Sequence, residues 1–151
     1  MKSSKNAGRQ SAILRLVDAN INRFSEGARV VEDIARFIMN NPRLTRGWKK
    51  VRHDLRRGLS GWPITAPASL FKHRRVQEDV GKGSTAAELT RRTVTDILLA
   101  NTQRMKESLR VLEEFAKLYD PAMAAHVKSL RYRVYTLEKS SLEIVSRLCH
   151  N

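Results

Sequence analysis

The stretch at residues 19–37 reads ANINRFSEGARVVEDIARF, and it returns at residues 100–118 as ANTQRMKESLRVLEEFAKL. The two copies are identical at eight matched positions, and five of these are polar. A repeat kept only for packing would retain its apolar positions and let its polar surface diverge, so the repeated polar residues need another explanation. The matched identities are Ala19 with Ala100, Asn20 with Asn101, Arg23 with Arg104, Glu26 with Glu107, Arg29 with Arg110, Val30 with Val111, Glu32 with Glu113 and Ala35 with Ala116.

Apolar residues recur at steps of three and four around the first copy, which predicts a packed helix over about residues 12–40. Asn41-Pro42 should end this helix, because the residue before a proline avoids helical geometry. The same spacing predicts a second helix over about residues 44–59 and a fourth over about residues 121–148, with the second copy of the repeat on a third helix between them.

The repeat extends beyond the first helix of each copy. Val51-Arg52 in the second helix matches Leu130-Arg131 in the fourth, once two residues are dropped from the turn. The repeated unit is therefore a helical hairpin, and the sequence predicts an all-α fold of four long helices in two pseudo-twofold-related hairpins joined by a long loop. We expect a single helical domain over residues 1–151, divided into repeat 1 at about 12–59, a connecting loop at 60–84 and repeat 2 at about 85–148.

Composition and charge bound the class of protein. A chain of 151 residues suits one domain, and its 7 Gly, 4 Pro and 6% aromatic residues favour long helices over an all-β fold. The single Cys149 cannot form an internal disulfide, and no apolar run approaches the roughly 20 residues of a membrane span, so we expect a cytoplasmic protein. The net charge of +14, with 19 Arg against 10 Lys, indicates an anionic partner, although genomic base composition explains the Arg excess equally well.

The repeated polar residues suggest a ligand pocket. On a helical projection Asn20 and Arg23 share a strip beside the small Gly27, and Glu26 flanks them. A small residue facing a bundle interior leaves room, and Asn and Arg supply donors, so we expect a pocket between the long helices. The alternative is a buried Arg23–Glu26 pair that fixes helix register. The second copy repeats the set as Asn101, Arg104, Glu107 and Ser108.

Two further repeated pairs have the spacing of ion pairs within a helix. Arg29 precedes Glu32 by three residues, and Arg110 precedes Glu113 by the same spacing. Pairs of this kind on a helix surface contribute roughly a few tenths of a kcal/mol each. We therefore expect both pairs at the surface.

The connection between the repeats is a second candidate site. Residues 81–85, GKGST, lead towards a helix N-terminus, where free N–H groups favour an anion, and residues 85–88 have the spacing of a capping box. Asp79 is a candidate magnesium ligand. An ordinary turn and cap explains the same residues. Leu70-Phe71 forms an apolar turn that is expected to pack on the core.

Five segments carry a family resemblance: RLVDANINRFSEGARVVEDIARF, VRHDLR, EDVG, ANTQRMKESLRVLEEFAKL and LRYRVYTLE. Over about residues 14–138 the chain resembles the strictly monofunctional hydroxymethylpyrimidine-phosphate kinase, a bacterial helical domain often fused to thiamine-phosphate synthase. The resemblance implies an ATP-binding phosphotransferase that uses Mg²⁺ and phosphorylates 4-amino-5-hydroxymethyl-2-methylpyrimidine phosphate, giving the diphosphate for thiamine biosynthesis. The synthase barrel usually found downstream is absent, so we expect either a stand-alone kinase or an excised half.

Phosphoryl transfer needs charge neutralisation and alignment, which repeated arginines can supply. On this hypothesis the symmetry provides two related anion pockets, one for each substrate, and a carboxylate holds the magnesium ion. The expected catalytic residues are Arg23, Glu26, Arg104, Glu107 and Asp79; the substrate-binding residues are Asn20, Asn101, Arg29, Arg110, Arg52 and Arg131; the nucleotide-binding residues are Gly81, Lys82, Gly83 and Arg75; and the metal ligands are Asp79, Glu26 and Glu107.

Two other functions compete with the kinase. The first is a non-catalytic module that binds an anion or docks on thiamine-phosphate synthase. The second is a basic helical protein that binds nucleic acid, which is disfavoured because no recognition motif accompanies the charge. A homodimer is compatible with an amphipathic bundle. The sequence leaves open which repeat binds ATP, which carboxylate holds the metal, the oligomeric state, and whether the chain is part of a longer fusion.

Overall fold

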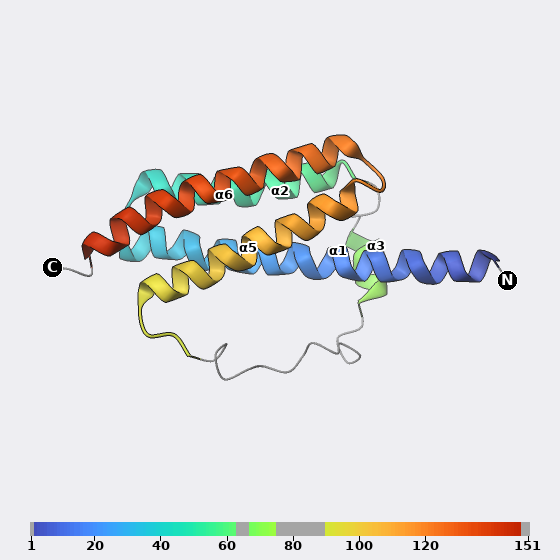
Figure 1. The fold of residues 1–151 in the computed structure, drawn as a ribbon, viewed down its shortest axis with the longest axis horizontal. Helices are drawn as coiled ribbons and strands as arrows, with labels where there is room; N and C mark the ends of the chain where they lie inside the picture. The colour runs from blue at the N-terminus through green and yellow to red at the C-terminus, as the bar shows by residue number, and fades with distance from the viewer. Residues whose placement is uncertain (1, 63–66, 75–89, 149–151) are drawn as a thin grey trace.

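Helices make up the fold of the chain in the computed structural model, which describes residues 2–62, 67–74 and 90–148 (Figure 1). The described residues contain no strand, and the predicted all-α fold with four long helices is confirmed. A short additional helix, α3, follows the first hairpin. The elements in chain order are α1 (Lys2–Asp33), the π-helix η1 (Ile34–Ile38), α2 (Pro42–Ser60), α3 (Pro67–His73), α5 (Val94–Ala116) and α6 (Pro121–Leu148).

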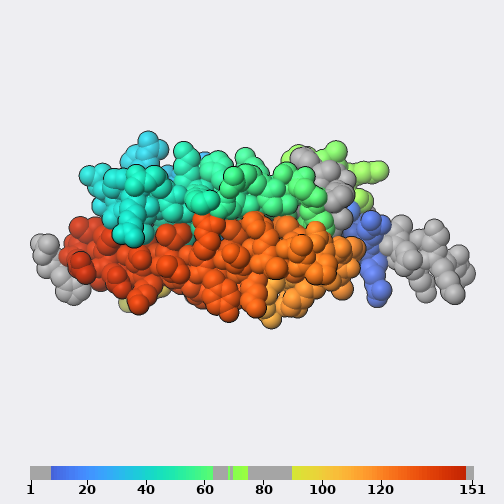
Figure 2. All heavy atoms as spheres, turned by 90° about the horizontal axis from the view of Figure 1, so that it is seen from above, coloured from blue at the N-terminus to red at the C-terminus, as the bar shows by residue number. Residues whose placement is uncertain are grey.

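The four long helices lie in two layers. Helices α1 and α5 pack against each other in one layer, and α2 and α6 lie side by side in the other, as the view from above shows (Figure 2). Each hairpin therefore contributes one helix to each layer. The single domain over residues 1–151, with its division into repeat 1, loop and repeat 2, stays a prediction.

Two close helix contacts reveal the pseudo-twofold relation between the hairpins. A Cβ added at Gly47 would lie 2.7 Å from Leu137 Cδ2, and one added at Gly58 would lie 2.6 Å from His126. By the repeat alignment, residue 47 is equivalent to 126 and residue 58 to 137. The two contacts between α2 and α6 thus exchange with each other, as expected when a twofold axis passes between these helices. Glycine permits the close approach at each contact.

The second helix of each hairpin begins with the same local signal. Asn41 Oδ1 accepts a hydrogen bond of 2.9 Å from the Leu44 backbone N–H, and Pro42 is the first residue of α2. Asp120 Oδ1 accepts hydrogen bonds from the backbone N–H groups of Ala122 and Met123, over 2.9 and 3.1 Å, and Pro121 begins α6. A capping Asn or Asp followed by proline satisfies donors at the helix start, which is why both starts lie close to the predicted positions.

The first long helix differs from the expectation at both ends. Helix α1 begins at Lys2 rather than near residue 12, and its continuation η1 is a π-helix, in which the Met39 N–H donates to Ile34 O over 2.9 Å. The turn that follows has Asn40 at a φ of 47°. Between equivalent residues of the repeat, the connection from the first to the second helix is two residues longer in the first hairpin than in the second. Ile38 lies in this π-helical end and is 51% exposed.

The third long helix begins later than predicted. Helix α5 starts at Val94, and residues 90–93 before it are not helical. A different capping box starts it: Thr93 Oγ1 accepts from the Asp96 N–H, and Asp96 Oδ2 accepts from the Thr93 N–H, both over 3.0 Å. The box predicted at residues 85–88 lies outside the described residues.

The core fills the space between the two layers. Burying a large apolar side chain stabilises the fold by roughly 1.5–3 kcal/mol. The buried apolar side chains of this core therefore supply most of the favourable free energy of folding. Within the described part of the chain, no helix is long and apolar enough to cross a membrane. The largest fully buried side chains are Trp48, Phe24, Leu55, Leu98, Met105, Leu109, Leu112, Leu130, Val17, Val31, Val51 and Val127.

Candidate functional site

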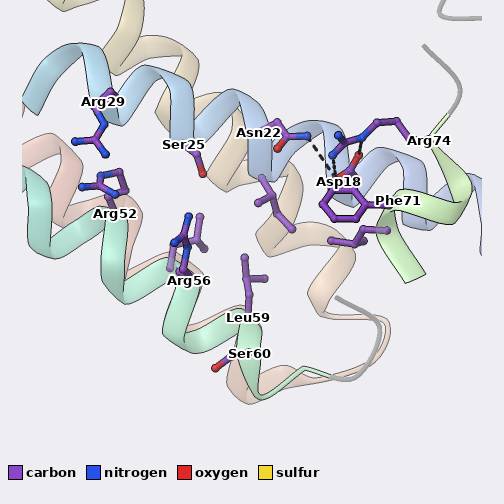
Figure 3. A pocket seen from close by; sticks show the side chains of 13 residues that line it. Asp18, Asn22, Ser25, Arg29, Arg52, Arg56, Leu59, Ser60, Phe71 and Arg74 are labelled. Atoms are coloured by element: carbon purple, nitrogen blue, oxygen red, sulfur yellow. Dashed lines mark hydrogen bonds and ion pairs between the residues drawn. The ribbon is translucent and has the colours of Figure 1, made fainter. Parts of the chain in front are cut away.

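A cavity of about 600 Å³ opens between α1, α2 and α3 (Figure 3). This volume lies within the range of roughly 300–1,000 Å³ that is typical of small-molecule sites. Its lining combines apolar residues with arginines and short polar side chains. The lining residues are Ile21, Leu55, Leu59, Leu70 and Phe71, then Asp18, Asn22, Ser25 and Ser60, and finally Arg29, Arg52, Arg56 and Arg74.

Glu32 holds two of these arginines beside the cavity. Arg52 Nε donates to Glu32 Oε2 over 2.9 Å, and both side chains are largely buried, at 13% and 8% exposure. Arg29 Nη1 lies 3.5 Å from Glu32 Oε1, and its side chain is 56% exposed. Glu32 therefore fixes Arg52 firmly, while the guanidinium of Arg29 keeps most of its donors for another partner.

Helix α3 is fastened to α1 at the other end of the cavity. Arg74 donates from Nε and Nη2 to the two carboxylate oxygens of Asp18, each over 2.7 Å. This hydrogen bonding raises the pKa of Arg74, and the guanidinium also lies 4.9 Å from the centre of the Phe71 ring. Ser11 Oγ lies 2.9 Å from His73 Nδ1, which adds a second polar contact between the same helices. The fork geometry of the Arg74–Asp18 pair sets the position of the α3 wall.

Arg56 is the most available cation in the cavity. It is exposed, and no hydrogen bond or ion pair joins it to another residue within the described ranges. Figure 3 shows its side chain between Arg52 and Leu59 on α2, opposite Ser25 of α1. An unpaired guanidinium above an apolar floor can bind a phosphate or carboxylate group on a small organic molecule.

Two of the residues predicted to bind substrate, Arg29 and Arg52, line this cavity. The asparagines do not. Asn20 Nδ2 donates to the Leu16 carbonyl over 2.8 Å, and Asn101 Nδ2 donates to the carbonyl of Ile97 over the same distance. Each amide therefore binds the preceding turn of its own helix, a symmetric and structural arrangement.

The predicted inward orientation of four repeated residues is wrong. Arg23, Glu26, Arg104 and Glu107 are all exposed, and Arg23 and Glu26 do not form the alternative buried pair. The small residue Gly27, expected to leave room for a ligand, faces another helix instead. A Cβ added at Gly27 would lie 3.0 Å from the backbone oxygen of Asn101 and 3.1 Å from Met105 Cγ, so the small residue lets α1 and α5 approach closely.

The second hairpin repeats the glutamate arrangement. Glu113 is 4% exposed and accepts bonds from Arg131 Nε at 3.1 Å and Nη2 at 2.9 Å, while Arg110 Nη1 lies 3.1 Å away. The pairs expected at the surface are therefore anchored on buried glutamates, because Arg52 and Arg131 reach them from the second helix of each hairpin. Arg110 and Arg131 do not line the cavity.

The predicted metal and nucleotide residues remain untested. Glu26 and Glu107 are exposed, and within the described ranges no group of three or more His, Cys, Asp or Glu side chains could hold a metal ion. Magnesium therefore stays a prediction from the sequence. The loop residues Arg75, Asp79, Gly81, Lys82 and Gly83 lie outside the described part of the chain.

Sequence comparisons relate the chain to proteins of thiamine metabolism. A family model described as the ThiD2 family matches residues 15–140. A thiamine-phosphate synthase of Synechocystis sp. is 45% identical over 141 residues, which cover 91% of this chain and 39% of the relative. Those of Rhodopirellula baltica and Nostoc punctiforme are 40% and 38% identical, covering 82% and 87% of this chain but 32% and 36% of the relatives. No solved structure gives a significant match.

These names contradict the expected kinase. Each relative is named for a different enzyme, thiamine-phosphate synthase, so the predicted hydroxymethylpyrimidine-phosphate kinase activity and the predicted ATP binding are wrong. The chain spans between 32% and 39% of the length of the three relatives. Each relative therefore contains a long segment that this chain does not match, and its name describes the whole protein.

Proposed function

The chain belongs to the ThiD2 family, and we propose that it is an anion-binding module that associates with thiamine-phosphate synthase in thiamine biosynthesis. The observation that carries this proposal is the cavity between α1, α2 and α3, which places four arginines over an apolar floor. The matched relatives support the association, because the segment equivalent to this chain is part of proteins named thiamine-phosphate synthase. A cytoplasmic location, a homodimer and the absence of nucleic-acid binding remain predictions from the sequence.

The charge balance of the cavity favours a doubly charged anion. Four lining arginines face two carboxylates, those of Asp18 and Glu32, which pair with Arg74 and Arg52. Two positive charges are left over, mainly on Arg29 and Arg56. A phosphate monoester carries about −1.5 to −2 charges at neutral pH and has three acceptor oxygens, so it complements this excess.

The apolar floor adds a requirement for an organic body. Leu55, Leu59 and Ile21 contribute hydrocarbon surface to the lining of the cavity, and Phe71 contributes from α3. Ligand sites of this kind combine a mostly apolar lining with a few polar groups that fix orientation. The class of ligand proposed is therefore a small phosphorylated metabolite, with its phosphate towards Arg29 and Arg56.

Substitution of Arg56 by alanine is expected to weaken the binding of inorganic phosphate and pyrophosphate. A hydrogen bond to a charged group contributes about 1.5–3 kcal/mol, so the dissociation constant should rise roughly 10- to 100-fold. The thermal midpoint should stay unchanged, because Arg56 is exposed and has no partner among the described residues. Isothermal titration calorimetry of the purified chain measures the first quantity and circular dichroism the second.

Arg46→Ala is the matched control, since Arg46 is also an exposed arginine of α2 but does not line the cavity. If both substitutions weaken phosphate binding equally, the effect comes from the net charge of the chain and not from the cavity. Turnover of ATP with the pyrimidine phosphate in a coupled assay would contradict the binding-module proposal itself. Sedimentation of the chain together with the thiamine-phosphate synthase of the same genome tests the association. If the two proteins sediment separately while the chain still binds phosphate, the association is refuted and the anion-binding function is not.

A further inference from the structure

The second hairpin contains the counterpart of the cavity, and its side chains differ at the positions that matter. By the repeat alignment, Ser25 of α1 corresponds to Lys106 of α5, and Leu59 of α2 corresponds to Glu138 of α6. Ser25 is half-buried and Leu59 is buried at the cavity. The first hairpin therefore has a short hydroxyl and an aliphatic side chain where the second has two long charged ones.

Lys106 and Glu138 form a tight ion pair across the second hairpin. Lys106 Nζ lies 2.9 Å from each carboxylate oxygen of Glu138, and Thr102 Oγ1 donates to Oε1 of the same carboxylate over 2.6 Å. The two charged side chains are only 15% and 11% exposed, and Lys106 Nζ lies 5.2 Å from the centre of the Tyr135 ring. Tyr135 stands where the first hairpin has Arg56, so the second hairpin also lacks that unpaired guanidinium.

We infer that the chain binds one anionic ligand, in the first hairpin, and that the Lys106–Glu138 pair closes the equivalent site of the second. The arginine pair is present in both hairpins, as Arg29 with Arg52 and Arg110 with Arg131. In the second, however, the side chains of Lys106 and Glu138 fill the equivalent position, and Glu138 neutralises Lys106, so no cation is added there for an incoming anion. This inference rests on the proposed anion-binding function, and it replaces the two symmetric pockets expected from the repeat.

Titration of the full chain with pyrophosphate tests the inference through a symmetric pair of variants. Arg29 and Arg110 are equivalent in the repeat, are 56% and 55% exposed, and each contacts the glutamate three residues on. Arg29→Ala should weaken binding at least about tenfold, as expected for loss of a charge-assisted hydrogen bond, whereas Arg110→Ala should change it less than about twofold. The wild-type chain should bind one equivalent.

Transfer of the ion pair to the first hairpin is the second arm. The double substitution Ser25→Lys with Leu59→Glu should abolish pyrophosphate binding, and circular dichroism establishes whether the variant folds. If it does not fold, the comparison of Arg29→Ala with Arg110→Ala decides alone. Two equivalents bound by the wild type, or equal weakening by both arginine substitutions, would overturn the single-site inference. No binding by any variant, the wild type included, would instead refute the proposed function.

Discussion

Replacement of Glu113 by alanine is expected to lower the free energy of unfolding by about 3 kcal/mol, because it leaves Arg131 buried without its counter-charge. The Arg131 side chain is 13% exposed, and Glu113 accepts both of its hydrogen bonds to α5. For a chain of this size the thermal midpoint should fall by roughly 6–12 °C. Thermal and urea unfolding followed by circular dichroism measure the change.

Glu32→Ala is the symmetric partner of this experiment. It should lower stability by a similar amount, because Glu32 holds Arg52 in the first hairpin as Glu113 holds Arg131 in the second. Only Glu32→Ala should also change pyrophosphate binding well below its melting temperature, since Glu32 contacts the cavity arginines Arg29 and Arg52. The pair therefore separates a stability effect from a binding effect within one chain.

Arg110→Ala is the control for the glutamate substitutions. Arg110 contacts the same carboxylate but is 55% exposed, so its removal should cost roughly 0–1 kcal/mol, as for other solvated ion pairs. A loss below about 1 kcal/mol for Glu113→Ala would mean that Arg131 finds water once the carboxylate is gone, contrary to the desolvation argument.

The helices and their starts could be predicted because their signals are local. Asn41-Pro42 and Asp120-Pro121 each combine a capping side chain with a residue that begins a helix, and no distant residue is needed to interpret them. The start of α5 predicted from the sequence is too early, because two capping-box spacings occur in this part of the chain. Only the one at Thr93 is seen to begin a described helix.

The site could not be predicted in the same way, because its geometry depends on partners from other helices. Glu32 has the spacing of a surface pair with Arg29, and only the approach of Arg52 from α2 makes it a buried anchor. From the sequence of α1 alone, the small residue Gly27 can indicate either space for a ligand or close packing with another helix. Its contact with α5 shows that it serves helix packing. The match of Val51-Arg52 with Leu130-Arg131 was the available signal for the buried glutamates.

The cavity also depends on α3, which comes from a segment without a helical repeat. The sequence predicts that Leu70-Phe71 packs on the core as one apolar turn. In the structure only Leu70 is buried, at 7% exposure, whereas Phe71 is 61% exposed beside the cavity. The contact that positions them, Arg74 with Asp18, joins residues 56 positions apart. No local pattern predicts such a pairing.

Substitution of Asp54 by asparagine is the second change expected to have a large effect. This carboxylate joins α2 to α6, accepting hydrogen bonds from Arg133 of α6 and from Lys50 and Arg57 of α2. Loss of charge-assisted bonds to a buried carboxylate, 8% exposed, should lower the free energy of unfolding by about 1.5–3 kcal/mol at neutral pH. The three cations would then face one another without a counter-charge.

The pH dependence of this loss identifies its electrostatic origin. Burial alone would raise the pKa of Asp54, but the hydrogen bonds from Arg133, Arg57 and Lys50 outweigh burial and hold the pKa well below its usual range. A carboxyl of the unfolded chain titrates near about pH 3.9, so above that value the folded-state contribution is fully present. As the pH falls from about 4 towards the lower folded pKa, the unfolded chain takes up the proton first, and the contribution shrinks by about 1.4 kcal/mol per pH unit.

The difference in unfolding free energy between the wild type and Asp54→Asn should therefore be constant from pH 7 to about pH 5 and should decrease below about pH 4. Urea unfolding at a series of pH values measures it. In an Arg133→Ala background the decrease should be smaller, because the foremost of the hydrogen bonds that lower the pKa has been removed. A difference that is independent of pH down to pH 3 would show that Asp54 stabilises the α2–α6 contact through its shape and not through its charge.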